Sequence, residues 1–280
     1  MQRITIPPDL KRIASPPKQL FHAGANLAEL LKRPRLAIIG SRSVTAYGRQ
    51  VTLQLAGQLA EQGIVIISGL ALGVDGLAHQ ACLDAGGLTI AVLPGPLDDI
   101  VPSTHQPLSD RILAQGGALI SEYDSGEFPA KTNFIARNRL VAGLSQAVLI
   151  TEAGEKSGSL HTARFALEQG KDVLAVPGNI TSVVSIGTNN LIKAGATVVT
   201  SYLDVLHALK LTDHQTKAHQ VRGRNAHEQT VLDLLLQGIS DADELLVGSQ
   251  LSATEFNQVL TMLEIGGKVR SLGANHWGLV

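Results

Sequence analysis

The sequence has little of several features that would assign it quickly to a class of protein. A single cysteine, Cys82, in 280 residues excludes a disulfide framework and fits a reducing compartment. The longest apolar stretch, Ile64 to Val74, is interrupted by Ser68 and Gly69 and is far too short to span a bilayer. No apolar run follows the charge near the N-terminus, which excludes a secretory signal. We therefore expect a soluble, cytoplasmic protein with no membrane segment.

Neither sign of charge dominates, because 23 basic and 24 acidic residues give a net charge of −1. Taken alone, this total argues against a nucleic-acid-binding protein. The total is a cancellation, since residues 1–35 carry seven basic and two acidic residues and residues 226–280 carry two and seven. Residues 36–209 have ten basic residues, and half of them fall between Lys131 and Arg164. This clustering predicts a local grip on an anion and excludes a broad basic surface.

The sequence is 44% hydrophobic, has 28 glycines, and repeats one order of elements from Arg35 to about Leu209. A short apolar run is followed by a glycine-rich turn and then by an amphipathic stretch. Short strands that are apolar on both faces and alternate with helices predict a doubly wound α/β fold with a mostly parallel sheet. Ligands of such sheets lie beyond the carboxyl ends of the strands. The apolar runs are Leu36–Ile39, Ile64–Ile67, Leu88–Leu93, Ala118–Ile120, Ala147–Ile150, Val173–Val176 and Ala196–Val199.

The segments that flank this region have a different character. Residues 1–34 contain five prolines and little periodicity, so we expect an irregular lead-in, and the polar residues 210–225 read as a linker. Residues 226–280 predict three helices and a β-hairpin, which is typical of a small winged-helix-like domain. Its expected recognition helix, Thr254 to Ile265, has no basic residue. We therefore expect this domain to bind a protein or to be structural and not to grip DNA.

The turn Gly40-Ser41-Arg42 follows the first strand of the predicted sheet. It lacks the G-x-G-x-x-G fingerprint, and no acidic residue ends the second strand, so a dinucleotide cofactor is not expected. A glycine, a hydroxyl and an arginine near a helix start suit a phosphate group. The alternative is a tight turn with an exposed arginine.

A second turn, Ala153 to Ser159, contains a lysine but lacks the spacing of a phosphate-binding P-loop, which excludes ATP hydrolysis on this evidence. Ser157-Gly158-Ser159 still opens a predicted helix after a strand. Its backbone N–H groups could hold a phosphate, or one of the serines could simply cap the helix.

The most informative stretch runs from Lys131 to Arg139. It holds three cations and Phe134 within nine residues, and no acidic residue lies between Glu127 and Glu152. Cations neutralise phosphates and a ring face accepts any base, which is the combination that single-stranded nucleic acid requires. The alternative is a solvated helix start whose Phe134 packs inward.

Signals for catalysis or metal binding are weak. The nine histidines have no H-x-x-x-H spacing, so we expect no metal site and no cofactor. Asp75 and His79 could pair across one helical turn, although capping or packing is the simpler interpretation. Glu152 follows a strand and could act as a general base, but no nucleophile with an orienting base is visible. The sequence therefore gives no catalytic residue.

Taken in order, these motifs resemble the DNA-processing protein A family, also called Smf or DprA. The resemblance covers about Pro17 to Leu209. Each matching sequence motif alone is weak evidence for the family, but the set of motifs in this order is specific to it. The matching strings are Leu36–Arg42, Ile67–His79, Thr89–Asp98, Phe134–Ser145, Ser157–Arg164, Val176–Asn179 and Gly187–Ala196.

The resemblance implies an extended Rossmann-like domain at 35–209 that binds single-stranded DNA without sequence preference. It further implies a homodimer that protects incoming strands in natural transformation, hands them to the RecA recombinase and is not an enzyme. The sequence departs from the family pattern at Val101, Ile135 and His161, and none of these changes removes a cation. The family's binding pocket maps onto Ser41, Arg42, Lys131, Phe134, Arg137, Asn138, Arg139, Ser157, Gly158 and Ser159.

One alternative belongs to another class of protein. Phosphoribohydrolases that cleave nucleotides have a related sheet, and Glu152 follows the appropriate kind of strand. Their P-G-G-x-G-T phosphate turn is absent here, and the nearest segment is Ala153–Ser159.

Overall fold

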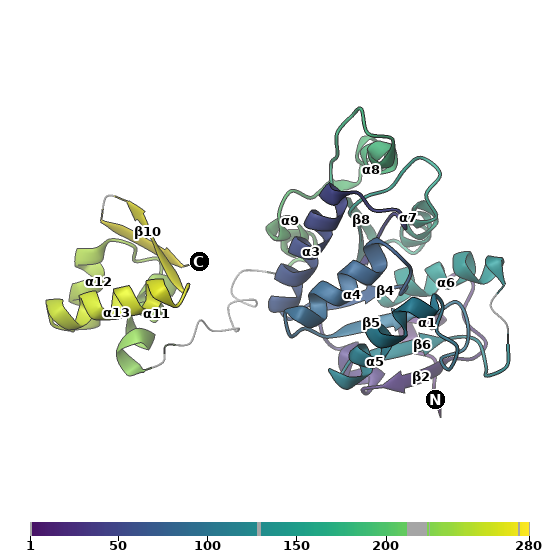
Figure 1. Ribbon diagram of the computed structural model, residues 1–280, viewed down its shortest axis with the longest axis horizontal. Helices are drawn as coiled ribbons and strands as arrows, with labels where there is room; N and C mark the ends of the chain where they lie inside the picture. Colours follow the sequence, from purple (N-terminus) through teal and green to yellow (C-terminus); the bar gives the residue numbers. More distant parts are fainter. Residues whose placement is uncertain (1, 128–129, 212–222, 224, 274, 280) are drawn as a thin grey trace. The chain divides into compact units, whose positions relative to one another are not determined.

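The computed structural model describes residues 2–127, 130–211, 223, 225–273 and 275–279. The chain divides into two compact units, Met1–Lys217 and Ala218–Val280, which are described separately (Figure 1). Most of the expected linker, 210–225, lies outside the described residues. Among the helices that are described, none is both long and apolar enough to cross a membrane.

The first unit is built on a nine-stranded sheet with the order β1-β2-β6-β5-β4-β3-β7-β8-β9. The seven strands from β6 to β9 pair in parallel, and β2 pairs antiparallel with both β1 and β6. The predicted doubly wound, mostly parallel α/β fold is therefore confirmed. The strands are β1 (Gln2–Arg3), β2 (Phe21–Gly24), β3 (Arg35–Ile39), β4 (Val65–Ser68), β5 (Thr89–Val92), β6 (Ala118–Ser121), β7 (Ala147–Ile150), β8 (Asp172–Ala175) and β9 (Thr197–Val198).

Helices cover both faces of this sheet, which explains why the central strands are apolar on both sides. Leu36 and Ile38 of β3 join the core beneath one set of helices, whereas Ala37 and Ile39 join the core beneath the other. The first set is α3 (Ala46–Glu61), α4 (Val74–Asp84), α5 (Gln106–Ala114) and α9 (Tyr202–Ala208). The second set is α6 (Lys131–Leu144), α7 (Ser159–Glu168), α8 (Ile186–Lys193) and the short α1 (Pro8–Lys11) and α2 (Leu27–Leu30).

The N-terminal segment is not the irregular lead-in that its prolines suggested. It adds β1 and β2 to the sheet, with Phe21 of β2 opposite Ser121 of β6. It also packs on α6, where Leu10 lies so close to Gly143 that a Cβ there would meet Leu10 Cδ2 at 2.7 Å. The expectation failed because β2 forms by pairing with a strand about 100 residues away and has no alternating pattern of its own.

The strand order reverses direction at β3. The chain lays β4, β5 and β6 on one side of β3, then crosses over through α6 to place β7, β8 and β9 on the other. The segments that leave β3 and β7 therefore diverge to opposite faces and leave a crevice between them. Such a switch point is where open α/β sheets bind their ligands.

The second unit has the predicted three helices and hairpin, α11 (Ala226–Leu236), α12 (Ala242–Ser249), α13 (Ala253–Ile265), β10 (Val269–Gly273) and β11 (His276–Leu279). Val231, Leu245 and Leu263 are fully buried in its own core. On α13, Met262 and Ile265 are more than half exposed.

Candidate nucleic-acid interface

A cavity of about 690 Å³ opens at the switch point of the sheet. The turn after β3, the turn after β7 and the first two turns of α6 supply most of its lining, and Ala71, Asp75 and Val184 complete it. The three regions that sequence reasoning singled out are thus brought to one place. Nine of the ten predicted site residues line the cavity, namely Ser41, Arg42, Lys131, Phe134, Arg137, Asn138, Ser157, Gly158 and Ser159.

Arg42 and Phe134 meet across this cavity. The Arg42 guanidinium carbon lies 5.2 Å from the centre of the Phe134 ring, within the range of a cation–π contact. Lys131 lies one helical turn before Phe134 on α6 and is exposed. The ring is half-buried, so it packs partly inward as the alternative interpretation held, yet it still lines the cavity beside two cations.

Backbone hydrogen bonds fix the turn after β3. Ser41 N donates to Glu152 O at 2.8 Å, and Val74 N donates to Ser41 O at 3.1 Å. Gly73 has φ +77°, and a Cβ there would lie 2.2 Å from Ser41 O, so only glycine permits this approach. The turn therefore holds Arg42 in place independently of any ligand.

The start of α7 follows the turn after β7, and its N-cap residue, Gly158, makes no side-chain cap bond. Ser157 Oγ bonds Ser159 Oγ at 2.7 Å and accepts from Ser159 N at 3.4 Å, while Leu160 N and His161 N donate to the backbone carbonyls of Ser157 and Gly158. The two serine hydroxyl groups and the positive end of the helix dipole still suit an anion.

Arg137 lines the cavity but is held by hydrogen bonds within the protein. It is 3% exposed, and its Nη1 donates to Gly69 O and Val92 O while its Nε donates to Asn138 Oδ1. Burial lowers the pKa of Arg137 to about 10, against the opposing effect of the Asp75 carboxylate. Arg137 ties α6 to the ends of β4 and β5 and so positions Phe134 and Lys131, while direct contact of its guanidinium with DNA stays a prediction.

Arg139 does not line the cavity, so its prediction as a binding residue is corrected. Its guanidinium forms a two-pronged ion pair with Glu122, at 2.5 and 2.7 Å, and donates to Ser15 O at 2.9 Å. The two side chains are only 13% and 15% exposed. Arg139 thus joins α6 to Glu122, which directly follows β6, and to the N-terminal segment. Two residues along a helix turn a side chain by about 200°, so Arg137 and Arg139 leave α6 on different sides.

Sequence reasoning missed one cation, Lys156, which lines the cavity from the turn after β7. Its position between Gly154 and Ser157, in a glycine- and serine-rich turn that follows a strand, is a signal that could have identified it. Arg42, Lys131 and Lys156 are exposed, and within the described parts of the chain none of the three has an ion pair. The cavity thus offers three exposed cations, an aromatic ring and the N-terminal end of α7.

The acidic side chains near the cavity have structural partners. The Glu152 carboxylate is 2% exposed and accepts from Thr45 N at 2.9 Å and from Thr45 Oγ1 at 2.5 Å. It thereby holds Thr45, the residue that caps α3. Asp75 accepts from Gly69 N at 3.0 Å, and burial raises its pKa. His79 bonds Thr89 rather than Asp75. These contacts fit capping and packing roles.

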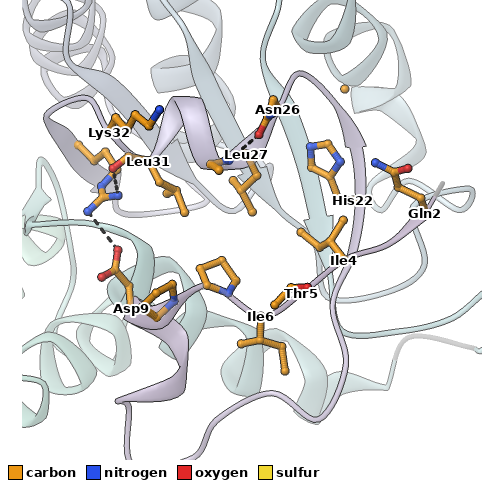
Figure 2. A pocket seen from close by; sticks show the side chains of 15 residues that line it. Gln2, Ile4, Thr5, Ile6, Asp9, His22, Asn26, Leu27, Leu31 and Lys32 are labelled. Atoms are coloured by element: carbon orange, nitrogen blue, oxygen red, sulfur yellow. Dashed lines mark hydrogen bonds and ion pairs between the residues drawn. The ribbon is translucent and has the colours of Figure 1, made fainter.

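A larger cavity, of about 850 Å³, lies among the N-terminal elements (Figure 2). Ile4, Ile6 and Leu27 make much of its wall apolar, and its arginine, Arg35, is paired with Asp9 at 3.1 Å. It contains none of the predicted site residues. The cavity at the switch point is therefore the better place for a polyanion.

The fold and the cavity define a Rossmann-like α/β protein with a cation-lined site for a polyanion, and comparison with known proteins agrees with this class. The sequence profile described as DNA recombination-mediator protein A matches residues 2–210, and that of the DprA winged helix domain matches residues 215–275. The chain belongs to the DNA recombination-mediator protein A family, a family of DNA-processing proteins.

Named relatives are about two fifths identical to this chain over the residues that align. DNA processing protein DprA of Streptococcus pneumoniae is 44% identical over 200 residues, 71% of this chain and 70% of that protein. Protein Smf of Escherichia coli is 44% identical over 208 residues, 74% of this chain and 55% of that protein. The putative DprA of Mycobacterium tuberculosis is 39% identical over 249 residues. The chain spans only 64% of that protein's length.

Two solved structures resemble the fold closely. DprA of S. pneumoniae superposes with a TM-score of 0.69 at 41% identity and covers 74% of this chain and 73% of that one. DprA of Helicobacter pylori superposes with a TM-score of 0.67 at 38% identity and covers 75% of this chain and 96% of that one. The description of the H. pylori structure is of a single-stranded DNA binding mode.

Proposed function

We propose that this protein binds single-stranded DNA without sequence preference in the cavity at the switch point of the sheet. One observation carries the proposal: Arg42 and Phe134 are held against each other, at 5.2 Å, where the N-terminal end of α7 and two further cations line the same cavity. The cations neutralise phosphates, and the ring stacks a base of any identity. The single-stranded DNA described for the H. pylori relative supports the proposal.

A salt titration tests this proposal directly. Three phosphate contacts predict that the logarithm of oligothymidine affinity falls with the logarithm of salt concentration with a slope of about −2. Arg42→Ala, Lys131→Ala and Lys156→Ala should each weaken binding and make the slope shallower by about 0.7 to 1. Phe134→Ala should weaken binding about 5- to 100-fold and leave the slope unchanged.

Lys32→Ala is the matched control, because Lys32 is an exposed cation that lines the larger cavity instead. It should bind DNA with the wild-type affinity and slope. A flat salt dependence, or a Lys32→Ala variant weakened as much as Arg42→Ala, would disprove the assignment of the site.

Beyond DNA binding, we propose that the protein acts as a homodimer that protects incoming strands and loads the RecA recombinase on them, as the family resemblance implies. We also propose that it is not an enzyme, because both carboxylate oxygens of Glu152 accept from Thr45, the N-cap residue of α3. Incubation with nucleoside monophosphates should release no free base. Release that is abolished in Glu152→Gln would favour the phosphoribohydrolase alternative.

A further inference from the structure

A second, smaller cavity of about 570 Å³ adjoins the DNA cavity at the same edge of the sheet. Three segments contribute neighbouring residues to both cavities: Ser43 and Thr45 after β3, Gly154 and Glu152 after β7, and Val184 and Ser185 before α8. Residues one or two apart lie within about 7 Å along a chain. The two cavities are therefore close enough for successive nucleotides of one strand to occupy them.

The chemistry of the second cavity differs from that of the first. No cation lines it, and its only charged group is the buried carboxylate of Glu152. The remaining polar groups are uncharged, among them Asn179, Ser182 and Ser185. A phosphate would be repelled here, whereas a neutral group that carries N–H donors would find acceptors.

The second cavity also contains an exposed aromatic ring. Tyr47, on the first turn of α3, is 46% exposed, and it is the one aromatic residue among the strongly exposed large apolar side chains of the described chain. Its hydroxyl donates to Pro177 O at 2.7 Å, which fixes the ring across the cavity. A ring that is held in place and left uncovered is a stacking surface with little entropy to lose on binding.

The opposite wall is equally well fixed. The Asn189 side chain bonds both backbone groups of Gly178, at 3.1 Å each. A Cβ at Gly178 would lie 2.2 Å from Ser185 Oγ, so a side chain there would displace this wall. The cavity is therefore formed before a ligand arrives.

We propose that this cavity is a second base-binding subsite, in which a neighbouring nucleotide of the same strand stacks its base on Tyr47 and turns its polar edge toward Asn179 and Ser182. The inference rests on the proposed single-strand binding. The phosphates on either side stay with the cations of the first cavity. Every base presents an N–H group on its pairing edge, so the subsite is tolerant of sequence.

Photocrosslinking tests the inference on the full chain. An oligomer of ten 5-iododeoxyuridine nucleotides should crosslink to peptides that contain Phe134 and to peptides that contain Tyr47. Crosslinks at Phe134 without any at Tyr47 would overturn the subsite and leave the proposed function standing. Failure of the wild-type protein to bind the oligomer in a salt-dependent way would instead overturn the proposed function.

Affinity measurements add an independent readout. Tyr47→Leu keeps an apolar side chain without a ring and should bind ten-nucleotide oligothymidine about 5- to 30-fold more weakly, while Tyr47→Phe should stay close to wild type. Binding of thymidine 5′-monophosphate, whose single base can fill only the first cavity, should be unchanged in Tyr47→Leu and reduced in Phe134→Leu. Equal affinity of Tyr47→Leu and wild type for the longer oligomer would contradict the subsite, as would equal weakening for both ligands.

Discussion

The guanidinium of Arg137 fills the space that a side chain at position 69 would need, since a Cβ on Gly69 would lie 2.4 Å from Arg137 Nη2. The bonds from Arg137 to Gly69 O and Val92 O join α6 to two strands of the sheet. The glycine after β4 therefore governs where the helix that carries Phe134 lies.

Gly69→Ala should push Arg137 out of its place and lower the free energy of unfolding by about 1–3 kcal/mol, as overpacked buried sites do. DNA affinity should fall as well, because α6 would shift. Gly57→Ala is the control: a Cβ in this interior turn of α3 would meet its nearest atom, Ala81 O, at 3.9 Å. It should leave stability unchanged or raise it by up to about 1 kcal/mol. Urea unfolding of both variants measures the difference.

Arg139→Ala should destabilise the fold by about 1.5–3 kcal/mol, because it leaves the mostly buried Glu122 carboxylate without its partner. The salt slope of DNA binding should stay that of wild type. A double-mutant cycle with Glu122→Ala measures the coupling between the two side chains by urea unfolding. A shallower slope in Arg139→Ala would return this residue to the binding site.

Stability should fall with pH below about 6.5 through His79. Burial, with His105 and Arg137 nearby, lowers the pKa of His79 to about 3 from its ordinary 6.5. Between these values the unfolded chain binds a proton that the folded protein does not, so the free energy of unfolding drops by up to about 1.4 kcal/mol per pH unit as the pH falls.

His79→Asn provides the comparison for this effect. Thr89 Oγ1 donates to Ile66 O at 2.7 Å, so it accepts from His79 Nδ1, a role that the Asn amide can fill without titrating. Urea unfolding at pH 7, 6 and 5 should give a shallower pH dependence in the variant. Parallel pH dependences would show that the pKa of His79 is not lowered in the folded protein.

Removal of residues 226–280 should leave oligothymidine affinity within about twofold of wild type. The expected recognition helix α13 carries Glu255 and Glu264 and no basic residue, so it has no cation to neutralise a phosphate. RecA loading should be scored separately on the same shortened chain. A tenfold loss of DNA affinity would show that the second unit does contact the strand.

Much of the site could be predicted because the chemistry lies in turns that follow strands. The apolar runs located β3 to β9, and the parallel fold then required Gly40-Ser41-Arg42 and Ser157-Gly158-Ser159 to meet at one edge. Lys131, Phe134 and Asn138 recur at helical spacing and do line one cavity. Local pattern was sufficient for these residues.

The roles of Arg137 and Arg139 could not be predicted in the same way. Both belong to the basic stretch from Lys131 to Arg139. Composition alone predicts that every cation in this stretch contacts a DNA phosphate. Their partners, Gly69 O and Val92 O for one and Glu122 for the other, come from strands that lie far away in the sequence. Only the folded arrangement distinguishes a cation that holds a helix from one that awaits a phosphate.

The pairing of β2 with β6 bears on where this protein can be cut. A chain shortened to begin at Arg35, the boundary that composition suggests, would expose β6 as a sheet edge ready to pair with another molecule. It would also remove Ser15 from Arg139 and Leu10 from the surface of α6. Such a fragment should aggregate and bind DNA poorly although it keeps every residue of the cavity. The first 34 residues therefore serve as a structural support that holds the binding helix α6 in position.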